Sequence, residues 1–555
     1  MNHPQPHIAH SCSRVLKATV AFALAVCATI PGYVLIKYGI HFSDEPYQIL
    51  NAMDYRESPF SSLASFLYGI FGEITGFSWL AFRYLALTLA NLSIFVAGIY
   101  LYSSSGKPLW SGAVTAVALL LSGLSRMLYN LFGWDCISTL LIVLTLMPTL
   151  AYIRKSSPAT AVAVAGTLTA LAILARLPNA AVIVAVSVII IFGAPATPQR
   201  GRLRAAMPFL ATYISAVLIV SAAVVTLLFG SPAAFVDSVA RNILTQHSLK
   251  SLLVLYAVDG SRVVMIIATM WVVIRTTDRM ADAHLPWPIK AAIFIVIGLI
   301  LFILLHFHSS FVSTSYYAEG LLIAVTVRTV YPSGHSANYR ARALTAVAVV
   351  MFGFAAAAGS NIGVRKFLSW PLLPISVALL MQTCTLRRIA LYGAITLLPL
   401  LAQAGVECQR ESFLDAGPDK ATVRIESGAA KGLYTTSWNE ARLNEITGAR
   451  ESLPPGTRTV VLGENPWRFL YEYFFAGRST FAPHEWRNTS LLDSDSYMKW
   501  VRTLMENRGD STLALVCLHR EDDIPSRMEV MLDNSNAERL RYDSFTLYVY
   551  PPLPR

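Results

Sequence analysis

The chain has 555 residues, of which 55% are hydrophobic and only 14% are charged. This balance excludes an ordinary soluble protein, because such a chain does not string together apolar runs long enough to cross about 30 Å of hydrocarbon. The formal net charge is +11, but the basic residues lie mostly in short gaps between apolar runs, as in cytoplasmic loops. We therefore expect a polytopic membrane protein that contacts membrane lipids and has no nucleic-acid partner.

Apolar runs recur up to about residue 406 and predict an α-helical polytopic membrane protein with about thirteen transmembrane helices. The first run follows Arg14 and Lys17 without a convincing small-residue cleavage site, so we interpret it as a retained span. An odd number of spans places the two termini on opposite sides of the membrane. The expected spans are 18–37, 79–102, 109–125, 136–153, 159–175, 179–193, 206–229, 259–275, 289–306, 318–331, 343–358, 370–384 and 390–406.

The charges of the connections predict the orientation. Connections such as "IRKSSP", "APATPQRGRLR" and "CTLRR" carry the basic residues, which are retained on the cytoplasmic side. The sequence therefore predicts a cytoplasmic N-terminus and an extracytoplasmic C-terminal domain, and the compact cytoplasmic loops favour a bacterial inner membrane. The alternate, external connections hold the acids Asp44, Glu45, Asp54, Glu57, Glu73, Asp135, Asp237 and Glu319.

Two domains are expected. Residues 1–406 form the transmembrane domain, with a first external loop at 38–78, and residues 407–555 form an extracytoplasmic soluble α/β domain, because the composition becomes mixed and polar. In the first external loop, the apolar and glycine-interrupted stretch "SSLASFLYGIFGEITGF" predicts an interfacial helix.

The C-terminal domain shows a strand, helix, helix, strand order. "TRTVVLG" and "STLALVCLH" are typical of buried strands, and "NPWRFLYEYFFAG" and "SYMKWVRTLMENRG" of amphipathic helices. "SFTLYVYPP" alternates like an edge strand. Nucleotide binding is not expected, since no strand end is followed by a glycine-rich phosphate loop.

The acidic pair in "SDEPYQ" is the first candidate for chemistry. Asp44 and Glu45 follow the first span closely, where a loop folded back on the helix bundle would hold a carboxylate over a cavity. Such a carboxylate can act as a general base for an acceptor, or hold a divalent metal ion against a phosphate. Simple solvation of two loop acids is the alternative.

This arrangement resembles the GT-C glycosyltransferases, which include protein O-mannosyltransferases and the aminoarabinose lipid A transferases. The shared features are a first span, an acidic pair in a large first external loop, many further spans and a C-terminal external domain; "SDEPYQ" is similar to the family's Asp-Glu element. The resemblance implies transfer of a sugar from a polyprenyl-phosphate donor to a lipid, glycan or protein acceptor at the extracytoplasmic face. It also implies that Asp44 is the catalytic base or a metal-proximal acid, with Glu45 beside it.

Asp135, in "SRMLYNLFGWDCIS", matches by position a second acid that family members often hold in the next external loop. The resemblance therefore implies a third catalytic residue at this position. The alternative is a carboxylate that caps the fourth span, where the helix dipole favours negative charge.

Basic residues on the external side are candidates for binding the donor phosphate. Arg176 lies in the turn "LARLPN", and Arg365 and Lys366 lie in "GSNIGVRKF", against the general charge bias of the external loops. Arginine can hold a phosphate by bidentate hydrogen bonds. Contact with ordinary lipid headgroups is the alternative for all three. Asn361, in the same loop, is an expected substrate contact.

The stretch "HFHSSFVSTSYYAE" brings polar side chains to another external mouth. We expect His306, His308, Tyr317 and Glu319 to line a substrate cavity. A zinc site lacks a third ligand nearby in the sequence. The metal ligands therefore stay unassigned, and a divalent cation, Mg²⁺ or Mn²⁺, stays open as a cofactor.

A membrane glycosyltransferase is the expected function, with two alternatives. A transporter or flippase of lipid-linked or other substrates predicts ionisable residues near span midpoints. A non-catalytic subunit of cell-surface polysaccharide assembly would use the C-terminal domain as a binding module.

Overall fold

The structure is a computed structural model that describes residues 7–42, 44–56, 62–125, 132–155, 157–194, 201–236, 249–307, 311–331, 338–359, 363–413, 415–463, 468–475, 495–507, 511–519, 527–533 and 535–552. The chain divides into two compact units. The first consists of Met1–Ile36, Tyr84–Leu227 and Ser248–Arg410, and the second of Lys37–Arg83, Leu228–His247 and Glu411–Arg555. The expected domains, 1–406 and 407–555, stay a prediction; the expected first external loop, 38–78, falls in the second of these units.

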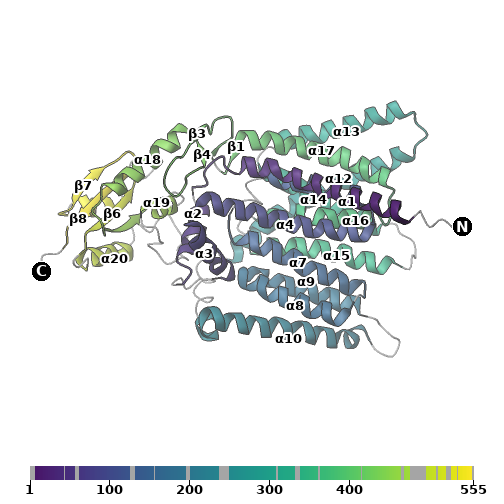
Figure 1. Cartoon of the computed structure of the whole chain (residues 1–555), viewed down its shortest axis with the longest axis horizontal. Coiled ribbons are helices and arrows are strands. Elements are labelled where there is room, and N and C mark those ends of the chain that lie inside the picture. Colours follow the sequence, from purple (N-terminus) through teal and green to yellow (C-terminus); the bar gives the residue numbers. More distant parts are fainter. Residues whose placement is uncertain are drawn as a thin grey trace. The chain divides into compact units, whose positions relative to one another are not determined.

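The first unit is a bundle of long apolar helices, which run alongside one another in Figure 1. Every apolar run that the sequence predicts as a span coincides with a helix in this structure. The helices are α1 (His7–Leu35), α4 (Trp79–Ser105), α5 (Pro108–Leu124), α7 (Trp134–Ile153), α8 (Pro158–Ala175), η1 (Leu177–Ala180), α9 (Ala181–Gly193), α10 (Arg202–Phe229), α12 (Leu249–Asp282), α13 (Trp287–Phe307), α14 (Phe311–Val330), α15 (Tyr339–Ala357), η2 (Gly363–Lys366), α16 (Ser369–Leu380) and α17 (Leu386–Arg410).

Within the described part of the chain, 9 helices are long and apolar enough to cross a membrane. Shorter apolar helices add to them, among them α5, α9 with its preceding turn, and α16. The protein is therefore an integral membrane protein, as predicted. The expected number of about thirteen spans stays a prediction, since length and hydropathy alone do not show which of the shorter helices cross.

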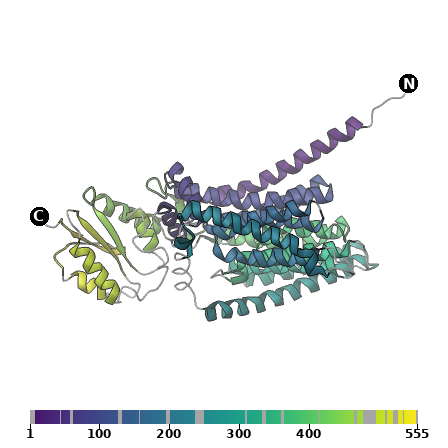
Figure 2. The ribbon, with the colours of Figure 1, turned by 90° about the horizontal axis from the view of Figure 1, so that it is seen from below.

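Helix α1 packs against α5 through small residues. A Cβ atom on Gly112 would lie 2.6 Å from the Cβ of Ala21, and one on Gly123 would lie 3.1 Å from the Cα of Gly32. Small residues let two helix backbones approach closely where lipid removes the hydrophobic drive for association. The N-terminal end of α1 stands away from the other helices (Figure 2). Only 17% of the apolar stretch of α1 is buried. The contact with α5 is therefore its main packing contact with the other helices.

The second unit contains a four-stranded sheet of order β5-β6-β8-β7. The strands β5 (Arg458–Leu462) and β6 (Leu513–Leu518) are parallel, while β8 (Phe545–Tyr550) is antiparallel to both β6 and β7 (Glu538–Arg541). The two predicted buried strands are therefore confirmed. The prediction of an edge strand at 544–552 is wrong, because β8 is internal and mostly buried. The edge strands are β5 and β7, and all four residues of β7 are exposed.

Helices and short strands complete the second unit. The predicted helix in the first external loop is confirmed as α3, and the two amphipathic helices as α19 and α20, whereas α18 was not predicted. The remaining elements are α2 (Asp44–Met53), α3 (Leu63–Thr75), β1 (Glu411–Ser412), β2 (Asp415–Ala416), β3 (Val423–Arg424), β4 (Tyr434–Thr435), α18 (Ser437–Glu451), α19 (Arg468–Phe475), α20 (Asp495–Glu506) and α21 (Arg527–Asp533).

Candidate functional site

Three of the predicted site residues meet in the first unit. The ammonium group of Lys366 forms an ion pair with the Asp135 carboxylate, and Nε of Arg176 lies 3.3 Å from Oδ1 of the same carboxylate. These residues are far apart in the sequence and belong to η2, the end of α8 and the start of α7. One carboxylate therefore lies between two cations, and the cluster carries an excess of one positive charge.

The local structure explains how each of these side chains is held. Asp135 lies in the first turn of α7, where the helix dipole favours a negative charge. Arg176 follows the last residue of α8 in an extended conformation, and its Nη1 donates a hydrogen bond to the carbonyl of Ala356 at 3.0 Å. Lys366 ends the short helix η2. Asp135 therefore lies where the helix dipole favours its charge and also pairs with both cations, while Gly133 is the N-cap residue of α7.

A small cavity of about 30 Å³ adjoins this cluster, with the side chains of Asp135 and Lys366 in its wall. Hydroxyl groups of Ser122, Ser138 and Thr139 add hydrogen-bonding capacity. This volume is room for about two water molecules. The Asp135 carboxylate occupies the position between the two cations. The side chain of Asp135 remains 37% exposed.

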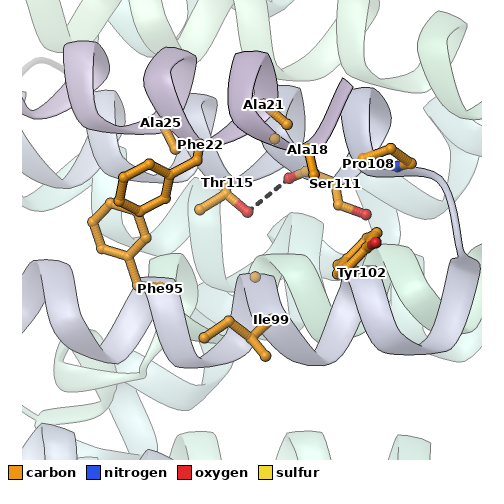
Figure 3. A pocket seen from close by; sticks show the side chains of 12 residues that line it. Ala18, Ala21, Phe22, Ala25, Phe95, Ile99, Tyr102, Pro108, Ser111 and Thr115 are labelled. Atoms are coloured by element: carbon orange, nitrogen blue, oxygen red, sulfur yellow. Dashed lines mark hydrogen bonds between the residues drawn. The ribbon is translucent and has the colours of Figure 1, made fainter. Parts of the chain in front are cut away.

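A larger hollow of about 140 Å³ lies between α1, α4 and α5, and it is almost entirely apolar (Figure 3). Alanine and glycine line much of it, and the rings of Phe22 and Phe95 lie against each other at its edge. Within the described residues, no Asp, Glu, Lys, Arg or His contributes to its lining. It therefore offers no chemistry, and the smaller cavity beside Asp135 is the candidate site.

Asp44 begins α2 in the second unit, and its side chain is 41% exposed. Its backbone N–H donates to Nδ1 of His41 at 3.0 Å, so the imidazole satisfies one of the free N–H groups at the helix start. Burial holds the pKa of His41 below its ordinary value, while the neighbouring Asp44 and Glu45 carboxylates act in the opposite direction. Asp44 is thus a half-exposed carboxylate on a well-defined helix end.

Glu45 occupies a different environment from that of its neighbour. Its side chain is fully buried; Trp79 donates to its carboxylate from Nε1 at 2.8 Å, and Arg83 donates from Nε at 3.0 Å and from Nη2 at 2.5 Å. A carboxylate enclosed by three protein donors does not reach an acceptor without breaking this ion pair. Its predicted part in catalysis stays a prediction, and its position is that of a support for α2.

The second predicted cluster is only partly described. Glu319 on α14 is fully buried, and neither of its carboxylate oxygens has a hydrogen-bond partner among the residues that the structure describes. Tyr317 is also buried, and Nδ1 of His306 lies 3.3 Å from Oε1 of Gln403. His308, Asn361 and the side chain of Arg365 lie outside the described residues.

Asp259 on α12, which was not predicted, adds a second acid near Glu319. It lies within electrostatic range of Glu319 and accepts a hydrogen bond from the Tyr316 hydroxyl. Asp259 also lies 3.8 Å from Nη1 of Arg262 through its Oδ1. A complete metal site is not present in the described segments, where no group of three or more His, Cys, Asp or Glu could hold a metal ion.

Several residues of these clusters were missed by sequence reasoning. Arg83 and Trp79 open the second expected span, and a charged residue inside a span is a signal of a buried partner. Asp259 likewise stands at the start of the expected span 259–275. Their partners are tens of residues away in the chain, and hydropathy does not show which distant residues pair.

The fold and the site together define a helical integral membrane protein with a sheet-containing C-terminal domain and a carboxylate held between two cations. No family model matches the chain, and no curated protein matches it. Among solved structures, ArnT from Cupriavidus metallidurans in the apo state matches with a TM-score of 0.41 and 11% identity, over 98% of this chain and 98% of that chain. The same protein bound to undecaprenyl phosphate matches with a TM-score of 0.43 and 11% identity, over 95% and 97% of the two chains.

Proposed function

We propose that this protein is an integral membrane glycosyltransferase of the GT-C type. It transfers a sugar from a polyprenyl-phosphate donor to a lipid, glycan or protein acceptor at the extracytoplasmic face of a bacterial inner membrane. The observation that carries the proposal is the cluster in which Arg176 and Lys366 share the carboxylate of Asp135. Two cations with one shared anion suit a group that carries more than one negative charge, as a departing phosphate does.

The proposed reaction uses the three groups as follows. Asp44 accepts the proton of the acceptor hydroxyl, and the acceptor oxygen forms a bond to the anomeric carbon of the sugar. The bond between that carbon and the phosphate oxygen breaks, and its electron pair goes to the phosphate. Arg176 and Lys366 stabilise the charge that develops there. A polyprenyl phosphate is already a good leaving group, so strong acid catalysis is not required.

Donor binding displaces Asp135 from its cations in this proposal. The carboxylate pairs with both Arg176 and Lys366, so the phosphate takes its position between them. The released carboxylate is then free to orient the acceptor. A divalent cation, Mg²⁺ or Mn²⁺, remains a proposal; Asp259 and Glu319 are the described carboxylates that would hold it, and it would help to neutralise the phosphate.

The proposal is tested by binding of radiolabelled polyprenyl phosphate to the purified protein in nanodiscs. Lys366→Gln and Arg176→Gln should each weaken binding by roughly 10- to 100-fold, because a charge-assisted hydrogen bond contributes about 1.5–3 kcal/mol. Arg154→Gln is the matched control. Arg154 follows the last residue of α7, at the opposite end of that helix from Asp135, and bonds to Tyr100 and Ser104. Equal binding by all four proteins would contradict the proposal.

A transporter or flippase is the second candidate, and one observation favours it. Asp259 and Glu319 are buried ionisable residues on long helices, and such residues often mark substrate or ion pathways. A flippase moves labelled polyprenyl-phosphate sugar across sealed proteoliposomes without adding the sugar to an acceptor. Movement without transfer, abolished by Glu319→Gln, would favour this candidate over the glycosyltransferase.

A further inference from the structure

We propose that Glu45 is a positioning residue, and that the C-terminal domain holds α2 so that Asp44 stays at its exposed start. This inference concerns the second unit alone and rests on the proposed role of Asp44. It gives the C-terminal domain a part in the reaction, although that domain contributes none of the proposed reacting groups.

The first step is the direction in which α2 presents its side chains. Consecutive residues of an α-helix point about 100° apart. The buried ion pair of Glu45 with Arg83 therefore fixes the rotation of α2 about its axis. With Glu45 turned inward, Asp44 points outward, and its side chain is 41% exposed. A helix free to rotate would not hold this carboxylate in one direction.

The second step is that residues of the C-terminal domain complete the environment of this ion pair. The guanidinium of Arg83 lies 3.9 Å from the ring centroid of Phe413, and its Nη1 donates to the carbonyl of Gly39 at 2.7 Å. Trp79, the other donor to Glu45, packs edge-on against Tyr473 with ring centroids 5.8 Å apart. Phe413 takes a left-handed φ of 56°, which is unfavourable for a bulky side chain and indicates that the surrounding packing holds it.

The third step is direct contact between α2 and α19. The rings of Tyr47 and Phe469 have centroids 4.8 Å apart, and both side chains are buried. Burial of the Tyr47 hydroxyl raises its pKa to about 12. The hydroxyl of Tyr473 donates to the carbonyl of Phe77 at 2.8 Å, just before the start of α4. Helix α19 therefore contacts α2, which carries Glu45, and also the residues just before α4, which carries Trp79 and Arg83.

The fourth step is that the chain before α2 is also held by the domain. The backbone N–H of Gly39 donates to the carbonyl of Tyr434 in β4, and the N–H of Tyr434 donates to the carbonyl of Lys37, both at 2.8 Å. The N–H of Ile40 donates to Oδ2 of Asp415 at 3.1 Å. The Asp415 carboxylate also accepts hydrogen bonds from the side chains of Thr435 and Asn439. The C-terminal domain therefore holds this carboxylate in the position where it accepts the Ile40 N–H.

Hydrogen exchange measured by mass spectrometry on the full chain in nanodiscs tests the inference. In Phe469→Ala and in Glu45→Gln, amide exchange of residues 44–53 should become at least tenfold faster, with little change in α15. Phe469→Leu should restore much of the protection, because it fills most of the space. Val501→Ala is the matched control, since Val501 is buried in a separate hydrophobic cluster with β5 and β6 and should leave residues 44–53 unchanged.

The outcomes separate this inference from the proposed function. Unchanged exchange of residues 44–53 in both Phe469→Ala and Glu45→Gln would overturn the inference, whatever happens to sugar transfer. Faster exchange throughout the chain would also overturn it, because the effect would then be general unfolding. If exchange rises only at 44–53 and the turnover of sugar transfer falls with an unchanged donor KM, the positioning role is supported. If exchange rises there but Asp44→Asn transfers sugar normally, the positioning role stands and the proposed function fails.

Discussion

At the scale of single residues, the role open to each carboxylate depends on its burial and on its hydrogen-bond and ion-pair partners. Two neighbouring acids, Asp44 and Glu45, have opposite environments, one half-exposed and one fully buried. The sequence predicts an acidic pair after the first span but does not distinguish its members. The two acids differ because Arg83 and Trp79 bind Glu45. These partners lie more than thirty residues further along the chain, so local sequence pattern does not reveal the pairing.

Asp135→Asn gives a prediction with an unexpected sign. If the Asp135 carboxylate competes with phosphate for Arg176 and Lys366, a neutral amide should let polyprenyl phosphate bind about tenfold more tightly or better. The rate of sugar transfer should fall at the same time, because the released carboxylate no longer orients the acceptor. Weaker phosphate binding by Asp135→Asn would show that the carboxylate helps to assemble the site instead of competing for it.

Glu319→Gln probes the buried carboxylate for which the described part of the chain offers no hydrogen-bond partner. A buried charge without a partner is costly, so the neutral isostere should keep or raise the unfolding temperature, by a few °C at most. The measurement is thermal unfolding in nanodiscs without added metal and with Mg²⁺ or Mn²⁺. A lower unfolding temperature for Glu319→Gln in the presence of the ion alone would instead identify Glu319 as a cation ligand.

His41 predicts a loss of stability on acidification. Its pKa is lowered by burial, so its contribution to stability is fully present above the ordinary pKa of about 6.5 and is lost as the pH falls below that value. His41→Asn keeps a hydrogen-bond acceptor for the Asp44 N–H but does not titrate. Between pH 7.5 and 5.5, the wild-type unfolding temperature should therefore fall further than that of His41→Asn. Parallel curves would mean that His41 does not titrate as its burial implies.

At the scale of elements, the apolar pattern of the sequence predicts which segments form helices, but it does not predict which helices pack against each other. Every expected span became a helix because an apolar run in lipid must satisfy its own backbone hydrogen bonds. The ion pair of Asp135 and Lys366 joins residues 231 apart in the sequence, and no periodicity encodes that pairing. Three of the four strands of the C-terminal sheet were predicted, but β8 was expected at the edge because its sequence alternates, and its outer neighbour β7 was not predicted.

Two glycines in helices should respond oppositely to alanine. Gly112→Ala places a methyl group against Ala21, and overpacking of this kind costs about 1–3 kcal/mol. Gly405→Ala meets no described atom within 4 Å, and it should stabilise α17 by roughly 0.5–1 kcal/mol. Thermal unfolding of both variants provides the comparison. An unfolding temperature for Gly112→Ala at or above that of the wild type would show that α1 does not pack on α5 through these residues.

At the scale of the whole molecule, the charged residues that the proposal needs come from segments spread along the chain. The proposed base, Asp44, belongs to the second unit, and the proposed phosphate-binding residues Arg176 and Lys366 belong to the first. A polytopic architecture with charges at helix ends could be predicted from hydropathy and loop charge. Which of those charges meet depends on tertiary packing, and the sugar and the acceptor depend on contacts that neither composition nor spacing specifies.

Sugar transfer by Asp44→Asn tests the central claim most directly. Membranes that contain the wild-type protein, Asp44→Asn or the control Arg154→Gln are supplied with labelled polyprenyl-phosphate sugar, and incorporation into acceptor is followed over time. Loss of a general base lowers a rate by about 100- to 10,000-fold, so transfer by Asp44→Asn should fall by at least about 100-fold while Arg154→Gln stays near the wild type. Transfer by Asp44→Asn at the wild-type rate would contradict the account.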